Sequence, residues 1–277
     1  MDVFDAHPCA LGEGVLWHPR RKALFWFDIL GKQLFCKGDT RQAWSFDEHV
    51  SAAGWVDDDT LLMASASGLW RFDISTGARD LVVALEADNP VTRSNDGRAD
   101  PQGGFWIGTM GINAEAYAGA IYRYHKGELR KLFADITISN AICFAPDGRT
   151  AYFTDTFSKR LQRVALDSDG WPIGAPEVFL DLRADGLNPD GAVVDADGNL
   201  WNAQWGAGRV ACYDPEGRYL RNIAVPASQT TCPAFGGADG TTLFVTSAAT
   251  GVDEAQGGMT FFEDVGVKGQ QEHQVIL

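Results

Sequence analysis

A repeat of turns and short apolar runs extends through the whole chain and constrains its fold more than any other feature. Runs such as ALFWF, GFWIG and TLFVT each follow a cluster of turn residues, and a second apolar run follows most of them. This alternation is typical of antiparallel strands joined by short turns. The six turns begin at Pro19, Asp57, Pro101, Pro146, Ala196 and Ala238, with gaps of 38, 44, 45, 50 and 42 residues.

Six units of this length predict a propeller. A unit of about 40–50 residues holds enough strands for one small antiparallel sheet, and blades of this kind pack around an axis. Helical periodicity is weak, and no Gly/Ser-rich or Pro-rich linker divides the 277 residues. We therefore predict an all-β protein, a six-bladed β-propeller with four-stranded antiparallel blades, formed by a single domain over residues 1–277. A large β-sandwich and an open solenoid are the alternatives, which the regular period disfavours.

Charge and composition restrict the partners and the compartment. The formal net charge of -14 argues against nucleic acid and anionic membranes. The first residues, MDVFDAHPCALGEG, lack the basic and apolar regions of a secretory signal, and no stretch is apolar for long enough to span a membrane. The five cysteines are widely spaced without a C-x-x-C pair, which indicates reduced thiols. We expect a cytoplasmic protein, a monomer or weak homo-oligomer, that binds neither nucleic acid nor membrane.

A second set of equivalent positions lies six residues before each turn. The apolar run after each of these positions reads as the innermost strand of its blade, so the six side chains should form a ring at one end of the central channel. Carboxylates and amides crowded near an axis are unfavourable unless a partner satisfies them. A hard divalent cation is one such partner, and the alternative is a polar ring around a water-filled channel mouth. The six positions are Glu13, Ser51, Asn95, Asn140, Asp190 and Cys232.

Strand geometry extends this ring. Residues two apart in a strand share a face, so Arg93 should lie beside Asn95, and Asn188 beside Asp190. Arg93 would bind an oxygen-rich substrate or an anionic product, or else pair with a ring carboxylate. Cys232 is either a soft ligand or a buried thiol.

Two similar Asp-Gly pairs fall at different places in the repeat. Asp-Gly is ordinarily a turn sequence, because glycine tolerates positive φ and aspartate bonds its own backbone. Asp197-Gly198 lies in the fifth turn, whereas Asp190-Gly191 lies at the ring position. We therefore predict a turn at the second pair and a candidate ligand at the first.

Long motifs along nearly the whole chain resemble one family. LGEGVLWHP, RSNDGRADPQGGFWIGTM, ISNAICFAPDGRTAYFTDT and NPDGAVVDADGNLWNAQWG occur in order, with GGADGTTLFVTS near the end. They resemble the senescence marker protein, regucalcin and gluconolactonase family, and look closest to its bacterial aldonolactonases. The resemblance implies a six-bladed propeller with a divalent metal near the top of its channel.

The resemblance also implies roles for individual residues. The metal ligands would be Glu13 of GEG, Asn140 of SNA and Asp190 of PDG. Asn95 of NDG lies close by in the family and is implied in substrate or metal binding, and Arg93 in substrate binding. Some relatives place an acidic residue soon after GTM to contact the sugar. Here the chain runs GTMGINAEAY, and either Asn113 or Glu115 could occupy that place. Asn188, which strand geometry places beside Asp190, is a further candidate for substrate binding.

The expected reaction is metal-dependent hydrolysis of an aldonolactone, such as glucono-, galactono-, xylono- or arabinono-lactone, to the aldonic acid. The metal, which could be calcium, zinc, manganese, magnesium or ferrous iron, would polarise the lactone carbonyl. Asp190 is the expected general base, and a hydroxide held by the metal is the alternative nucleophile. The alternative functions are an organophosphate or other ester hydrolase on the same scaffold, and a non-catalytic calcium-binding propeller.

Overall fold

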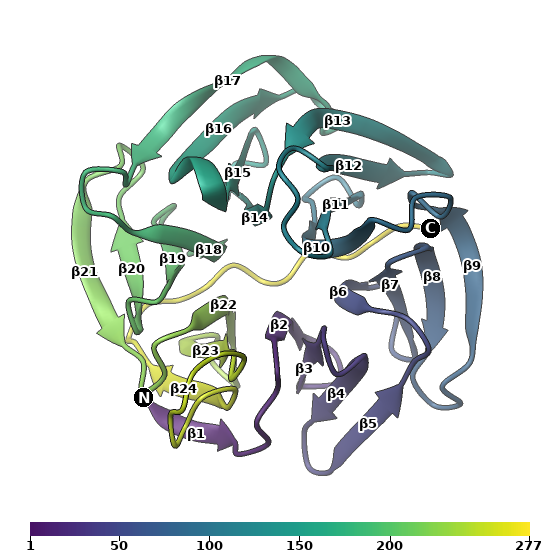
Figure 1. The fold of residues 1–277 in the computed structure, drawn as a ribbon, viewed down its shortest axis with the longest axis horizontal. Coiled ribbons are helices and arrows are strands. Elements are labelled where there is room, and N and C mark those ends of the chain that lie inside the picture. Colours follow the sequence, from purple (N-terminus) through teal and green to yellow (C-terminus); the bar gives the residue numbers. More distant parts are fainter.

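The computed structural model describes residues 1–277 and consists almost entirely of β-strands. Twenty-four strands form six four-stranded antiparallel sheets, which surround a central axis as blades (Figure 1). The remaining regular element is one turn of 3-10 helix, η1 (Thr156–Ser158). The predicted all-β, six-bladed propeller is therefore confirmed. The structure contains no helix that is long and apolar enough to cross a membrane.

Each of the first five blades uses four consecutive strands, counted here from the axis outwards. Blade one consists of β2 (Gly12–His18), β3 (Ala23–Asp28), β4 (Gln33–Lys37) and β5 (Arg41–Ser45), and blade two of β6 (Val50–Trp55), β7 (Thr60–Ser65), β8 (Gly68–Asp73) and β9 (Arg79–Ala84). Blade three consists of β10 (Thr92–Ala99), β11 (Phe105–Gly111), β12 (Gly119–His125) and β13 (Glu128–Ile136). Blade four consists of β14 (Ser139–Phe144), β15 (Thr150–Asp155), β16 (Arg160–Leu166) and β17 (Pro172–Asp181), and blade five of β18 (Asn188–Val194), β19 (Leu200–Trp205), β20 (Arg209–Tyr213) and β21 (Tyr219–Ala224).

Blade six joins the two ends of the chain. Its inner strands are β22 (Thr230–Gly236), β23 (Thr242–Ser247) and β24 (Thr260–Asp264), and its outermost strand is β1 (Asp2–Asp5) from the N-terminus. Val3 pairs with Phe261, and the N-terminal amine lies 3.0 Å from Glu263 Oε2. This pairing closes the ring of blades, a contact that the repeat in the sequence does not predict.

Apolar side chains fill the spaces between blades. The cluster between blades one and two contains Phe25 and Phe27 of β3, together with Met63 of β7 and Phe72 of β8. All four are completely buried, and burial of each such side chain contributes roughly 1.5–3 kcal/mol. This packing holds neighbouring inner strands at fixed positions around the axis.

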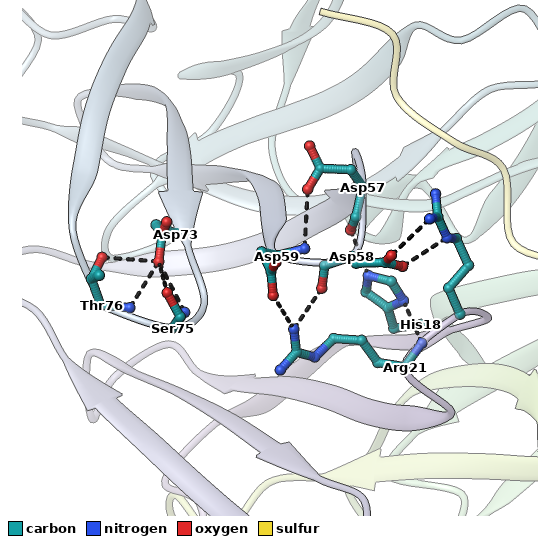
Figure 2. Close-up of polar contacts among 9 residues, drawn as sticks. His18, Arg21, Asp57, Asp58, Asp59, Asp73, Ser75 and Thr76 are labelled. Atoms are coloured by element: carbon teal, nitrogen blue, oxygen red, sulfur yellow. Dashed lines mark hydrogen bonds and ion pairs between the residues drawn. The ribbon is translucent and has the colours of Figure 1, made fainter.

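The turns between first and second strands bring charged residues of neighbouring blades together. In Figure 2, Arg21 from the turn of blade one reaches Asp59 from the turn of blade two, with 2.8 Å between Nη1 and Oδ1.

The predicted turn at Asp197-Gly198 is also present, since Gly198 has a φ of 90° and its amide donates to the Asp195 carbonyl at 3.1 Å.

The C-terminal segment, residues 269–277, crosses the centre of the propeller (Figure 1). Val275 N donates to the Trp55 carbonyl at 2.8 Å, and Gln270 Nε2 donates to the carbonyls of Phe144 and Val194 at 2.9 and 3.0 Å. Trp55, Phe144 and Val194 are the last residues of three innermost strands. The segment therefore covers the end of the channel where those strands finish.

Candidate functional site

The six predicted ring positions all lie on innermost strands, and all six side chains are buried: Glu13, Ser51, Asn95, Asn140, Asp190 and Cys232. In every innermost strand the pairing with the second strand shifts register at or beside this position. Such a bulge leaves residues outside the ladder and re-aims their side chains. The repeated bulge is thus the local feature that lets the inner strands direct polar side chains towards the axis.

Two of these bulges also require left-handed backbone. Gly14, directly after Glu13, has a φ of 56°, and a Cβ there would collide with the Ser51 carbonyl of the next blade. Ala141, directly after Asn140, has a φ of 57°, a conformation that L-residues rarely adopt. The backbone directly after Glu13 and directly after Asn140 is therefore left-handed, and the close approach of blade two leaves room only for glycine after Glu13.

A cavity of about 450 Å³ opens at the end of the channel where the innermost strands begin. We call it the axial cavity. Six predicted site residues line it: Glu13, Arg93, Asn95, Asn140, Asn188 and Asp190. A larger groove of about 740 Å³ lies between blades four and five, but it contains none of the predicted site residues. The predicted site residues therefore gather in the smaller, axial cavity.

Seven further residues line the axial cavity that were not predicted from the sequence: Leu11, Met110, Ile138, Thr156, Phe157, Lys159 and Trp205. Leu11 and Ile138 lie two residues before Glu13 and Asn140, so the spacing that predicted Arg93 would have found them. The others lie at or just after the ends of second strands; Trp205, for example, pairs with Asn188. Their signal is the antiparallel register, which brings the end of one strand beside the start of its neighbour.

Arg93 contacts amide and carbonyl oxygens in the cavity rather than a ring carboxylate. Its Nη1 donates to Asn95 Oδ1 at 2.7 Å and to the Ser94 carbonyl at 2.9 Å, and its buried Nε has no hydrogen-bond partner. The sequence left two interpretations of Arg93, substrate binding or an ion pair with a ring carboxylate. The structure contains no such ion pair. The Nε–H of Arg93 therefore remains available to donate a hydrogen bond at the cavity wall.

The cavity holds an excess of buried carboxyl groups. Burial raises the pKa of Glu13 to about 8, and Asp96 acts in the same direction, against the Gly14 amide and Arg93. Burial also raises the pKa of Asp190 well above its ordinary value, reinforced by Glu13 and Asp96, and raises the pKa of Asp96 to about 6. Arg93 is the only cation that acts on both Glu13 and Asp190, and burial lowers the pKa of Arg93 itself to about 10. An additional positive charge would be needed to hold these carboxyls ionised together.

The donors present fit a hard divalent cation. Asp190 Oδ1 is buried without any hydrogen-bond partner, and Glu13 and Asn140 line the same cavity. No three His, Cys, Asp or Glu side chains gather anywhere as a metal site, so the Asn140 amide oxygen would have to be the third ligand. Two carboxylates and one amide offer only oxygen, which suits calcium and similar ions better than a thiolate-seeking metal.

The remaining ring and loop candidates do not line the axial cavity. Ser51 Oγ donates to Ser94 Oγ at 2.8 Å, and Cys232 belongs to an apolar cluster where burial raises its thiol pKa, which favours the buried-thiol interpretation. Asn113 is exposed, and its Nδ2 donates to Glu115 Oε1 at 3.0 Å. In this structure Asn113 and Glu115 therefore contact each other rather than the cavity.

Comparisons with known proteins agree with this architecture. The family model for the SMP-30/Gluconolactonase/LRE-like region matches residues 11–249. A solved structure from Agrobacterium tumefaciens, described as a calcium-binding protein, regucalcin, is 44% identical, with a TM-score of 0.97 over 99% of this chain and 97% of that chain. A Rhizobium meliloti protein provisionally named a sugar lactone lactonase is 42% identical, over 95% of this chain and 92% of its own length.

The L-arabinolactonase of Azospirillum brasilense is 37% identical, over 88% of this chain and 83% of its own length. The matches to these relatives cover 99%, 95% and 88% of this chain. The chain therefore belongs to the SMP-30/gluconolactonase/LRE-like family.

Proposed function

We propose that this protein hydrolyses a sugar lactone to the open aldonic acid, with a divalent cation held by Glu13, Asn140 and Asp190. The observation that carries the proposal is the axial cavity, where two buried carboxyls with raised pKa values meet an amide, and Asp190 Oδ1 lacks a partner. The names of the Rhizobium and Azospirillum relatives, a sugar lactone lactonase and an L-arabinolactonase, support the reaction class. The calcium-binding description of the Agrobacterium relative supports the cation.

The chemistry divides between the cation and the side chains. When bound, the cation would supply Lewis acidity towards the lactone carbonyl. One oxygen of the Asp190 carboxylate would hold the cation, and the other would take a proton from water as the water oxygen bonds to the carbonyl carbon. The ring C–O bond then breaks, and the proton passes to the departing ring oxygen, which becomes a hydroxyl group. Water and lactone are the only reactants, and the aldonic acid is the only product.

The other cavity residues would orient the sugar. Arg93 has an unpartnered Nε, and its fixed fork suits hydroxyl and carbonyl oxygens. Asn95 and Asn188 add amide groups on the same strand faces. The apolar part of the wall suits the C–H faces of a sugar ring and limits water, and consists of Leu11, Met110, Ile138, Phe157 and Trp205. Asn113 and Glu115 would contact the sugar only if their loop moved, so their role stays a prediction.

The test combines a substrate panel with removal of the cation. We expect a purified, metal-loaded protein to release acid from pentono- or hexonolactones above the spontaneous rate, and a chelator to abolish this. Re-addition of calcium, zinc, manganese, magnesium or ferrous iron should restore turnover and rank the metals. Asp190→Asn should lower kcat by about 10²–10⁴-fold, the usual contribution of a general base.

The matched control is Asp197→Asn, which changes the exposed turn aspartate of the neighbouring Asp-Gly pair and should leave kcat unchanged. Full activity of the chelated protein, or of Asp190→Ala, would contradict the proposal. Calcium binding without turnover of any lactone would instead support the non-catalytic role suggested by the description of the Agrobacterium relative. Faster cleavage of a phosphotriester than of every lactone would point to the organophosphate alternative.

A further inference from the structure

A chain of four hydrogen bonds crosses the floor of the axial cavity. Arg93 Nη1 donates to Asn95 Oδ1 at 2.7 Å, and Asn95 Nδ2 donates to Asn140 Oδ1 at 3.1 Å. Asn140 Nδ2 then donates to Thr156 Oγ1 at 2.9 Å, and Thr156 Oγ1 donates to the Pro189 carbonyl at 2.7 Å. The chain links blades three, four and five, and it ends one residue before Asp190.

The direction of this chain is determined by its two ends. An arginine can only donate, and a backbone carbonyl can only accept. Each amide and the hydroxyl between them therefore have one orientation that satisfies all four bonds. The second amide hydrogen of Asn95 reinforces this orientation, because Nδ2 also donates to the Ser139 carbonyl at 2.8 Å.

Thr156 decides which atom of Asn140 is presented to the cavity. Its hydroxyl gives its own hydrogen to the Pro189 carbonyl, so towards Asn140 it can only accept. This holds the Asn140 nitrogen beside Thr156 and leaves the oxygen on the other side. That oxygen accepts once from Asn95 and has a second lone pair for another partner. A rotated amide would offer N–H groups instead, which cannot ligate a cation.

The backbone around Thr156 is itself fixed. Thr156 opens η1, and the preceding Asp155 caps this turn by accepting from Phe157 N at 3.1 Å. The Asp155 carboxylate also accepts from the amides of Thr137 and Ile138, each at 3.0 Å. Three hydrogen bonds to the Asp155 carboxylate thus fix the turn that places the Thr156 hydroxyl between blades four and five.

We propose that Thr156 is a positioning residue, whose hydroxyl orients the Asn140 amide so that its oxygen faces the cation site. The inference rests on the proposed function for the identity of the ligands. It concerns cation binding rather than the chemical step, so the two can be tested separately.

The experiment measures Ca²⁺ affinity of the full-length protein by isothermal titration calorimetry after removal of metal with a chelator. Thr156→Val keeps the shape of the side chain and removes the hydroxyl. It should raise the Kd for Ca²⁺ about 10–100-fold, the usual effect of losing a hydrogen-bond partner that orients a metal ligand. Thr156→Ser keeps the hydroxyl and should stay within about 3-fold of the wild-type Kd. At saturating Ca²⁺, kcat of Thr156→Val should return towards the wild-type value, because the base is intact.

Thr154→Val is the matched control. Thr154 lies on β15 opposite Asn140 in the strand pairing, and its hydroxyl donates to the Arg160 carbonyl at 2.7 Å, so this variant loses a comparable bond beside Asn140 while the bond between Asn140 Nδ2 and Thr156 Oγ1 stays in place. Its Tm should fall as much as that of Thr156→Val, while its Kd should stay near the wild-type value. Equal Kd values for wild type and Thr156→Val, equal weakening in both valine variants, or no Ca²⁺ binding by the wild type would each overturn the proposal. Ca²⁺ binding with this pattern but without lactone turnover would support Thr156 and refute only the lactonase function.

Discussion

His18 is a fully buried histidine at the end of the first innermost strand, and its two nitrogens have different partners. Nδ1 accepts from the Arg21 amide at 3.2 Å, which requires Nδ1 to be unprotonated, so Nε2 carries the hydrogen towards the Asp57 carbonyl at 2.9 Å. Figure 2 shows the imidazole between these two turns. The neutral ring therefore links blade one to blade two, a role that the sequence alone did not assign to any histidine.

This geometry predicts a loss of stability in mild acid. Burial lowers the pKa of His18, with Arg21 acting in the same direction and the Asp57 carbonyl and Asp58 acting against it. A lowered pKa in the folded state means that the stabilisation is complete above the unfolded pKa of about 6.5 and is lost as the pH falls through the folded pKa. His18→Gln should cost about 0.5–1.5 kcal/mol at pH 7 through one lost hydrogen bond.

The measurement compares urea unfolding of wild type and His18→Gln at pH 7 and at pH 5. The difference between the two proteins should narrow at pH 5, because only the wild type has this titrating group. A difference that stays constant over this interval would show that His18 does not titrate in linkage with folding.

At the scale of elements, the C-terminal segment is held by a buried ion pair. Arg98 Nη1 lies 2.7 Å from Glu272 Oε1, and each side chain is only 8% exposed. Arg98 Nη2 also donates to the Pro233 carbonyl of blade six at 3.2 Å. An irregular segment thereby becomes part of the channel, at the end opposite the axial cavity.

Removal of one partner from this pair should be strongly destabilising. Glu272→Leu leaves Arg98 buried without its carboxylate, and we expect the unfolding free energy to fall by about 3–5 kcal/mol. The double variant Arg98→Met/Glu272→Leu should recover most of this loss, because no unpaired charge remains.

The matched control is Glu177→Leu, since Glu177 pairs with Arg163 at the same 2.7 Å but on the surface, and loss of such a pair costs about 0–1 kcal/mol. Urea denaturation of the four proteins would give the comparison. Similar losses for Glu272→Leu and Glu177→Leu would show that burial adds nothing to the pair.

At the scale of the whole molecule, closure of the ring depends on β1. Phe4 of this strand packs against Trp26 of blade one and against Phe244 and Phe262 of blade six, with ring centroids 6.2, 5.0 and 6.1 Å apart. Because this contact joins the first and last blades, we expect the 277 residues to unfold in one cooperative transition. That result would support the predicted single domain.

Deletion of residues 1–5 should lower the unfolding free energy by about 3 kcal/mol or more, the cost of losing a packed aromatic. It should also promote aggregation, since β24 would become an unpaired edge. Urea unfolding followed by fluorescence, together with light scattering, checks both effects, and Phe4→Ala separates the packing from the strand pairing. An unchanged urea midpoint in the truncated protein would show that β1 does not close the ring.

The repeat in the sequence was sufficient to predict the blades and the innermost strands, because every unit places its turn and its polar position at the same offset. It could not predict Thr156 or Trp205 as cavity residues, since their positions depend on how second strands pair with first strands. Nor could it predict that Asn113 and Glu115 bond to each other, because the local fold of an irregular loop sets that contact.

The amino-acid sequence by itself determined the propeller, the position of Glu13, Asn95, Asn140 and Asp190 in one register, and the different positions of the two Asp-Gly pairs, one in a turn and one on an innermost strand. These features follow from local periodicity, which recurs in each unit and does not depend on contacts with distant parts of the chain. The closure by β1, the ion pair of Glu272 and the hydrogen-bond chain through Thr156 were decided only by the tertiary structure. Each joins residues from different blades or from opposite ends of the chain, and such contacts depend on the ring being closed.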